Sequence, residues 1–171
     1  MSFMATNSLA LNPSPIHFGT DGWRGVLGVD FTIERLLRVA AASAQELEYS
    51  APKDLESKQV IIGFDRRFLA QEMAEAVASA VRGCDLEPLL AEGFVPTPAC
   101  SWAVINRKAL GALVITASHN PPEWLGLKIK GPFGCSVDEV FTESVEKRLA
   151  VNVISNPIKG VTKKFDCRKE H

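Results

Sequence analysis

The feature that most constrains the fold is an apolar strand, an amphipathic helix and a second apolar strand that follow one another closely. Residues 60–62 are β-branched, as in a short buried strand, and Gly63 ends the run. Residues 68–81 carry apolar side chains at helical spacing, with Gly83 as the expected C′ residue, and residues 86–91 are again apolar. Roughly thirty residues is the usual length of a right-handed βαβ unit with parallel strands. The chain is therefore expected to build a mainly parallel sheet covered by helices.

The alternation of strands and helices continues on both sides of this unit. Residues 32–49 have the apolar spacing of a helix, and Thr32 is its expected N-cap. The further expected elements are a helix opened by Pro96 and Pro98, strands at residues 112–116 and 125–130, and a helix at residues 137–149. This order is typical of an α/β sandwich with a central, mainly parallel sheet.

Length and turn-forming residues divide the chain into three parts. The 171 residues are enough for one domain with a core, and 46% of them are hydrophobic. Residues 1–15 contain turn formers without a sustained period and are expected to form a flexible tail, whereas residues 16–150 form the domain. Residues 151–171 carry turn signals and then mostly charges, as in a connector toward a missing second domain.

Charge and cysteine spacing exclude several classes of function. A net charge of −1 predicts no broad basic surface for nucleic acid or an anionic membrane. No apolar run approaches the roughly 20 residues of a membrane span, and no signal peptide is recognisable, so a cytoplasmic protein is expected. The four cysteines lie far apart, which favours reduced thiols over a zinc site or disulfides, with the first two in or near the core: Cys84, Cys100, Cys135 and Cys167.

The run Thr-Ala-Ser-His-Asn-Pro-Pro at residues 116–122 places a hydroxyl nucleophile directly after an expected strand. The two prolines cannot continue a strand or a helix, so the chain must turn there. Ligands of open α/β sheets bind at strand ends, which makes Ser118 a candidate reactive residue. Taken alone, the same run is equally compatible with a plain turn whose side chains bond the local backbone.

A glycine-rich loop at residues 17–25 is a second candidate. It carries Thr20, Asp21 and Arg24 among three glycines, so backbone N–H groups can approach a ligand while Arg24 offers a two-pronged contact to phosphate. The glycine spacing is not that of a dinucleotide-binding loop. The alternative is a glycine-rich hairpin with an exposed arginine.

Two further charged clusters lie near expected strands. Asp65 and Arg66 follow the strand at residues 60–62 and are expected to form a structural ion pair that pins the active loop. Alternation along residues 126–130 puts Lys128 and Lys130 on one strand face, from which a cation could reach Ser118. The alternative for these lysines is an ordinary solvated strand face.

Together the clusters resemble one family, the α-D-phosphohexomutases, which includes phosphoglucomutases and phosphomannomutases. The resemblance runs from about Ile16 to the C-terminus and rests on ordered motifs: Phe-Gly-Thr-Asp-Gly-Trp-Arg-Gly at 18–25, Asp-Phe-Thr at 30–32, residues 63–69, Pro-Thr-Pro-Ala at 96–99, and residues 116–122 and 126–128. It implies the first domain of such an enzyme, a three-layer α/β/α sandwich with a central mixed, mainly parallel sheet.

The resemblance also implies a chemistry. Ser118 would carry a transferable phosphoryl group, and the intact enzyme would interconvert hexose 1-phosphate and hexose 6-phosphate through a hexose 1,6-bisphosphate, which also serves as activator. Mg²⁺ would take one ligand from the phosphate on Ser118 and the others from further domains. The other site residues implied are His119, Lys128 and Arg24 for catalysis and Thr20, Arg24, Asn120 and Lys128 for phosphate binding.

The chain departs from the family at two points. Trp124 and Leu125 precede Gly126 where many relatives read Tyr-Asn-Gly, so an amide near the loop is lost. The family's later metal, sugar and phosphate loops are absent from the sequence, so its expected partners are a hexose phosphate and the remaining domains, and the chain alone is expected to turn over poorly. A phosphosugar-binding or regulatory fragment and a purely structural fragment remain alternatives. A serine hydrolase is disfavoured because its nucleophile elbow, G-x-S-x-G, is missing.

Overall fold

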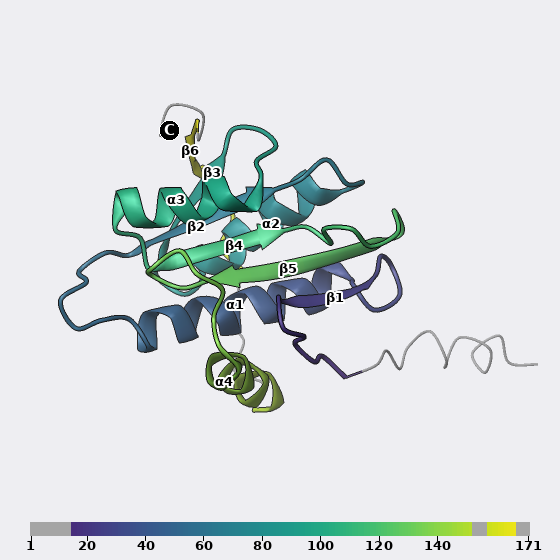
Figure 1. Ribbon diagram of the computed structural model, residues 1–171, viewed down its shortest axis with the longest axis horizontal. Coiled ribbons are helices and arrows are strands. Elements are labelled where there is room, and N and C mark those ends of the chain that lie inside the picture. Colours follow the sequence, from purple (N-terminus) through teal and green to yellow (C-terminus); the bar gives the residue numbers. More distant parts are fainter. Residues whose placement is uncertain (1–14, 152–156, 167–171) are drawn as a thin grey trace, which may run out of the picture.

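One six-stranded sheet with helices on both faces organises the described part of the chain, residues 15–151 and 157–166 of a computed structural model (Figure 1). The strands are β1 (Trp23–Val26), β2 (Gln59–Phe64), β3 (Glu87–Ala91), β4 (Gly111–Ile115), β5 (Trp124–Lys130) and β6 (Lys163–Phe165). The helices are α1 (Ile33–Tyr49), α2 (Ala70–Arg82), α3 (Thr97–Arg107) and α4 (Glu139–Ala150). The expected α/β class is confirmed.

The strand order across the sheet is β1-β5-β4-β2-β3-β6. The β4–β2, β2–β3 and β3–β6 pairs are parallel, whereas β5 is antiparallel to both of its neighbours, β1 and β4. A single reversed strand therefore makes the sheet mixed and mainly parallel, as predicted.

The crossover connections place the helices in two layers. The connection from β2 to β3 and the connection from β3 to β4 step in opposite directions along the sheet, so right-handed crossovers put α2 and α3 on opposite faces. Helix α1 packs against α2 and α4, on the face opposite α3. Figure 1 shows α1 and α4 below the sheet and α3 above it.

The core lies where β2 and β4 are covered on both faces. Ile61, Ile62, Leu113 and Ile115 have no exposed surface, as expected for central strands that read as continuous apolar runs. At Gly63 a Cβ atom would lie 2.3 Å from Sγ of Cys100 on α3, so the glycine allows close packing of that helix. No described helix is long and apolar enough to cross a membrane.

The helix ends agree with the sequence in one case and differ in another. Thr32 caps α1 as predicted, with its side chain accepting a hydrogen bond from the N–H of Arg35 at 3.4 Å. Gly83 was predicted as the C′ residue of α2 but is its C-cap, one position earlier, with a right-handed φ of −64°. The left-handed residue is Asp85, with φ of 60°, a conformation that Asp adopts more readily than most residues.

Two strands formed where the sequence did not predict them. Trp23–Val26, within the expected glycine-rich loop, is β1 and pairs with β5. Lys163–Phe165, within the expected connector, is β6 and adds to the edge of the sheet beside β3, with Phe165 only 3% exposed. Arg82 of α2 anchors the approach to β6 by donating to the carbonyl of Ile158 and the hydroxyl of Thr162. The expected N-terminal tail lies almost wholly outside the described residues.

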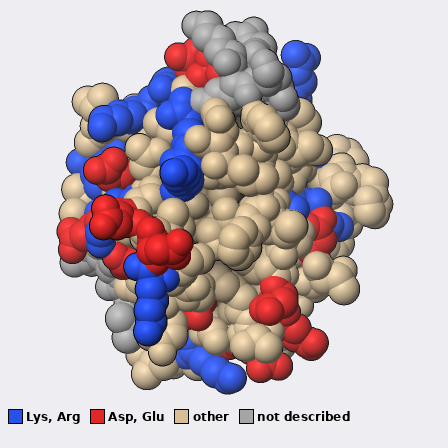
Figure 2. Space-filling view, turned by 60° about the vertical axis from the view of Figure 1, so that its left-hand side comes forward, with Lys and Arg blue, Asp and Glu red and all other residues tan. Residues whose placement is uncertain are grey.

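Surface charge agrees with the small net charge. On the face that Figure 2 shows, basic and acidic side chains are interspersed. The thiols are dispersed as well: Cys100 is buried, Cys84 is half-buried and Cys135 is exposed, while Cys167 lies outside the described residues.

Candidate functional site

Ser118 lies at the carboxyl end of β4, where the chain leaves the core. Ala117 is fully buried, whereas Ser118 and His119 are exposed. Ser118 has φ of 54°, in the left-handed region that non-glycine residues rarely occupy and that is frequent at functional sites. Its N–H donates to Oγ1 of buried Thr116 at 3.0 Å. The sheet therefore presents the serine hydroxyl to solvent on a sharply turned backbone.

Arg67 holds this turn from the neighbouring strand end. Its Nη2 donates to the carbonyl oxygens of Ser118 at 2.9 Å and Asn120 at 2.6 Å. Its Nη1 donates to the carbonyl oxygens of Pro121 at 2.8 Å and Trp124 at 3.0 Å. One guanidinium thus binds four backbone oxygens of the loop between β4 and β5.

Asp65 orients Arg67, which corrects one prediction. Oδ1 of Asp65 accepts the backbone N–H of Arg67 at 2.9 Å, and Oδ2 lies 3.6 Å from Nε of Arg67. The expected partner, Arg66, instead places its guanidinium carbon 5.1 Å from the ring centre of Phe94. The predicted ion pair that holds the Ser118 loop is present, but its basic partner is Arg67 and not Arg66. The Asp-x-Arg spacing could have indicated this, because Asp side chains commonly accept a hydrogen bond from the N–H two residues further on.

Arg24 reaches the serine loop from β1. It lies opposite Gly126 of β5, and its Nη1 donates to Oδ1 of Asn120 at 2.8 Å. A Cβ atom at Gly126 would lie 2.8 Å from both Cγ of Arg24 and the carbonyl oxygen of Thr116. A glycine at this position therefore lets the Arg24 side chain cross the strand toward the loop.

Lys128 lies deeper in the sheet, two residues further along β5. It is 8% exposed, and its Nζ forms an ion pair with Oδ2 of Asp21. In the described part of the chain no hydrogen bond joins Lys128 to the Ser118 loop. The predicted alternation is confirmed, because Leu127 and Ile129 on the opposite face belong to the core.

Asp21 is the common acidic partner of several cations. Oδ2 also lies 3.8 Å from Nη2 of Arg24, and Oδ1 accepts a hydrogen bond from Ser136 at 3.2 Å, whose hydroxyl accepts one from Nζ of Lys130 at 2.8 Å. Burial acts to raise the pKa of the Asp21 carboxyl. The hydrogen bond from Lys128 and the charges of Lys128 and Lys130 outweigh it, so this pKa lies below its usual range.

Close approach of the loop before β1 brings Asp21 to Lys128. Gly22 has φ of 104°, and a Cβ atom there would lie 2.3 Å from the carbonyl oxygen of Leu127. Only glycine combines this backbone with this contact. Thr20, in the same loop, is exposed. The structure therefore brings Arg24 and Asn120 together with the Ser118 loop, and leaves Thr20 and His119 without a hydrogen bond in the described region.

The side chains around Ser118 do not form a metal cage by themselves. Among the described residues, no group of three or more His, Cys, Asp or Glu side chains gathers at one place. By themselves, the described side chains therefore do not supply the set of oxygen ligands that Mg²⁺ takes in proteins.

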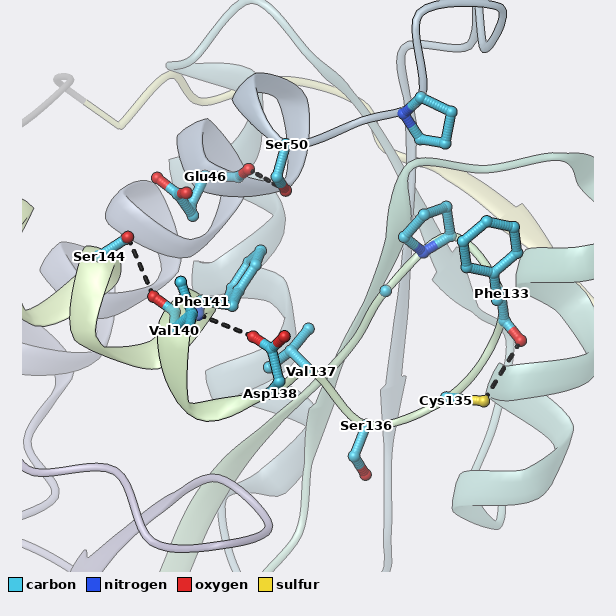
Figure 3. Close-up of a pocket in the computed structure, with 13 residues that line it drawn as sticks. Glu46, Ser50, Phe133, Cys135, Ser136, Val137, Asp138, Val140, Phe141 and Ser144 are labelled. Carbon is cyan, nitrogen blue, oxygen red and sulfur yellow. Dashed lines mark hydrogen bonds between the residues drawn. The ribbon is translucent and has the colours of Figure 1, made fainter.

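A cavity of about 420 Å³ lies away from Ser118, between α1, α4 and the loop after β5. Phe133 and Phe141 line it, and the buried carboxylate of Glu46, 2.7 Å from Nε of Arg148, lies at its wall (Figure 3). None of the predicted site residues lines it. The end of β5 pairs with the start of β4, so the cavity lies at the opposite end of β4 from Ser118.

Comparisons with known proteins point to one family. The family model described as phosphoglucomutase/phosphomannomutase, alpha/beta/alpha domain I, matches residues 15–152. The chain is 35% identical over 132 residues to a phosphoglucosamine mutase of Finegoldia magna, covering 76% of this chain and 28% of the relative. Identity and coverage are the same for a phosphoglucomutase/phosphomannomutase of Thermococcus kodakarensis.

The fold comparison agrees. A candidate phosphomannomutase from Thermus thermophilus superposes with a TM-score of 0.80 at 35% identity, covering 92% of this chain and 35% of that chain. The chain spans about a third or less of the length of the three proteins described here. Because the family model matches most of the chain, the protein belongs to the phosphoglucomutase/phosphomannomutase family and contains its α/β/α domain I.

Proposed function

We propose that this chain is the phosphoserine-carrying part of an enzyme that interconverts hexose 1-phosphate and hexose 6-phosphate. The observation that carries the proposal is the setting of Ser118, an exposed hydroxyl on a left-handed turn that Arg67 holds through four carbonyl oxygens. Family membership supplies the reaction class, because relatives are named phosphoglucosamine mutase and phosphoglucomutase/phosphomannomutase.

The proposed reaction consists of two phosphoryl transfers. In the first, a sugar hydroxyl attacks the phosphorus on Ser118. The bond from phosphorus to the serine oxygen breaks as the bond to the sugar oxygen forms, and the proton of the sugar hydroxyl passes, through a base, to the serine oxygen. In the second, the Ser118 oxygen takes the phosphoryl group at the other position of the hexose 1,6-bisphosphate and its proton passes to the sugar oxygen, which leaves the isomeric monophosphate and restores the phosphoserine.

Charge neutralisation is the main demand of phosphoryl transfer. Arg24 lies beside Asn120 of the serine loop and can neutralise phosphate oxygens. Lys128, on the same face of the sheet, would add electrostatic or acid/base help, as would the exposed His119. Bound Mg²⁺ would supply charge stabilisation of the transferring group, with the Ser118 phosphate as one ligand.

The geometry favours a phosphoryl carrier over a hydrolase nucleophile. A serine hydrolase requires a base within hydrogen-bond reach of the serine and a third group that orients that base. Within the described contacts, His119 bonds neither to Ser118 nor to an acidic side chain. A carrier serine needs only exposure and fixed position, and Ser118 has both.

The relatives bear on two further parts of the proposal, the substrate class and the need for further domains. The names of the relatives indicate phosphorylated hexoses and hexosamines as the substrate class. Because the chain corresponds to about a third or less of those relatives, we expect it to accept phosphate but to turn over poorly without the regions that the relatives add.

The direct test is the intact mass of the chain after incubation with glucose 1,6-bisphosphate. One added phosphate is expected for the wild type and for Ser144→Ala, which changes a serine that bonds only within α4, and none for Ser118→Ala. Modification of Ser118→Ala at the wild-type level would disprove the carrier role. Saturable binding of the bisphosphate without transfer to Ser118 would instead support a phosphosugar-binding fragment.

A further inference from the structure

We propose that Arg67 is the positioning residue of the Ser118 phosphoryl carrier, with Asp65 as the group that orients it. The inference rests on the proposed function for the role of Ser118. Neither residue is among those that the family resemblance implies for the site. Arg67 and Arg24 both donate hydrogen bonds to the Ser118 loop, and they differ in the donors that remain.

The four terminal donors of Arg67 are all used. A guanidinium has five N–H donors, and the four on Nη1 and Nη2 bind the carbonyl oxygens of Ser118, Asn120, Pro121 and Trp124. Nε, which carries the fifth, lies 3.6 Å from Oδ2 of Asp65, in an ion pair beyond hydrogen-bond distance. The Arg67 side chain is 15% exposed. It therefore has no terminal donor left for a phosphate and acts through the loop.

Arg24, in contrast to Arg67, keeps unused hydrogen-bond donors. It uses one Nη1 donor on Oδ1 of Asn120, and its Nη2 lies 3.8 Å from Asp21, beyond hydrogen-bond distance. Donors of Arg24 thus remain for an anion at the loop. The two arginines therefore have different roles: Arg67 fixes the loop backbone, and Arg24 can bind the ligand.

The four hydrogen bonds from Arg67 form a clamp on the carbonyl oxygens of the loop, and the backbone N–H groups of the loop are held separately. The N–H of Ser118 is bound to Thr116 and that of Asn120 to the carbonyl of Ala117, at 3.0 Å each. Between Ser118 and Asn120, only the N–H of His119 makes no hydrogen bond within the described residues. This N–H is therefore the loop donor that remains for a phosphoryl group on Ser118.

The first experiment measures loop order and does not depend on the reaction. Amide hydrogen exchange is compared in the 171-residue chain for the wild type, Arg67→Ala, Arg67→Lys and Arg66→Ala. Arg66 is the matched control, because it is the next residue and packs on Phe94. We expect the amides of residues 118–120, 123 and 124 to exchange about tenfold faster in both Arg67 variants, with β2 and β4 unchanged. Equal loop exchange in Arg67→Ala and Arg66→Ala would overturn the clamp.

Lys at position 67 separates charge from geometry. Its ammonium keeps the positive charge but has three donors on one atom and lacks the planar fork, so it cannot bind four carbonyl oxygens. Rescue of loop protection by Arg67→Lys would show that charge alone suffices and would contradict the positioning role of the fork.

The second experiment measures the initial rate of phosphate incorporation at Ser118 against glucose 1,6-bisphosphate concentration. We expect Arg67→Ala to lower the maximal rate about a hundredfold, as for a misplaced reacting group, with little change in the half-saturating concentration. Arg24→Ala should raise the half-saturating concentration. A raised half-saturating concentration with a normal maximal rate in Arg67→Ala would show that Arg67 binds the ligand and would refute its positioning role. If the wild type accepts no phosphate, the carrier function fails for this chain, and the exchange experiment still decides whether Arg67 clamps the loop.

Discussion

The carboxylate of Asp21 forms an ion pair with the ammonium of Lys128, which is 8% exposed on β5. The pair joins the glycine-rich loop before β1 to the strand that carries Gly126. Although burial opposes ionisation of Asp21, the pKa of its carboxyl lies below the usual range because of Lys128 and Lys130. The pair holds the loop and at the same time reduces the net positive charge beside the serine.

Acid should therefore weaken the fold through Asp21. A carboxyl whose pKa is lower in the folded state contributes stability that is present above its unfolded pKa, about 3.9, and is lost as pH falls through the lower folded value. Thermal unfolding midpoints between about pH 2 and pH 7 should show a smaller acid-induced decrease for Asp21→Asn than for the wild type. Parallel curves for the two proteins would show that Asp21 makes no contribution.

Lys128→Met should reduce phosphorylation of Ser118 without unfolding the chain. Met retains most of the buried apolar stem of Lys128 but removes its charge. Asp21 then loses its ion-pair partner, but its side chain is partly exposed and can be solvated by water. We expect a loss of about a hundredfold in the rate of phosphate incorporation, the size seen when a charge-stabilising donor is removed. Lys130→Met is the matched control on the same strand face, and its rate should stay near that of the wild type. Equal rates for both variants would refute the role of Lys128.

Gly126→Ala should displace Arg24 and destabilise the domain by about 1–3 kcal/mol, because its Cβ would lie 2.8 Å from Cγ of Arg24 and 2.9 Å from the carbonyl oxygen of Trp23. Chemical denaturation measures the change in the free energy of unfolding. Gly93→Ala is the control, since its Cβ would meet no atom within 4 Å. The prediction fails if the two alanine variants are equally stable.

The left-handed backbone of Ser118 predicts an unusual order of stability among its variants. Glycine relieves about 1–2 kcal/mol of backbone strain there and loses about 0.5–1 kcal/mol through the unfolded chain, so Ser118→Gly should be at least as stable as Ser118→Ala. At Ser101, inside α3, the order should reverse, with Ser101→Gly less stable than Ser101→Ala by about 0.5–1 kcal/mol. Thermal or chemical unfolding of the four variants measures both differences. The same order at both positions would argue against strain at Ser118.

Periodic elements and residue types could be predicted from the sequence, and pairings between distant segments could not. The βαβ unit around α2 and the Thr32 cap follow from local patterns that survive in the fold. Arg66 and Arg67 are chemically identical, and only the turn formed by Asp65 decides which of them faces the loop. β6 has three residues, two of them lysines, and becomes a strand because β3 offers it an open edge.

The candidate site shows the same division. The family resemblance implied Ser118, Arg24 and Asn120 as site residues, and in the structure Arg24 donates to Asn120 in the Ser118 loop. The placement of Lys128 beside Asp21 depends on the close approach of Gly22 to β5, which spacing along the chain does not reveal.

The reversed direction of β5 makes the length of the serine loop as important as its composition. Pairing of Val114 with Lys128 and of Arg24 with Gly126 fixes which side chains of β5 face the site. Insertion or deletion of one residue between Ser118 and Trp124 that shifted β5 by one position would turn Lys128 toward the opposite face and bring an apolar neighbour, Leu127 or Ile129, to the face that meets Asp21. Evolution and engineering can therefore vary the chemistry of this loop far more easily than its residue count.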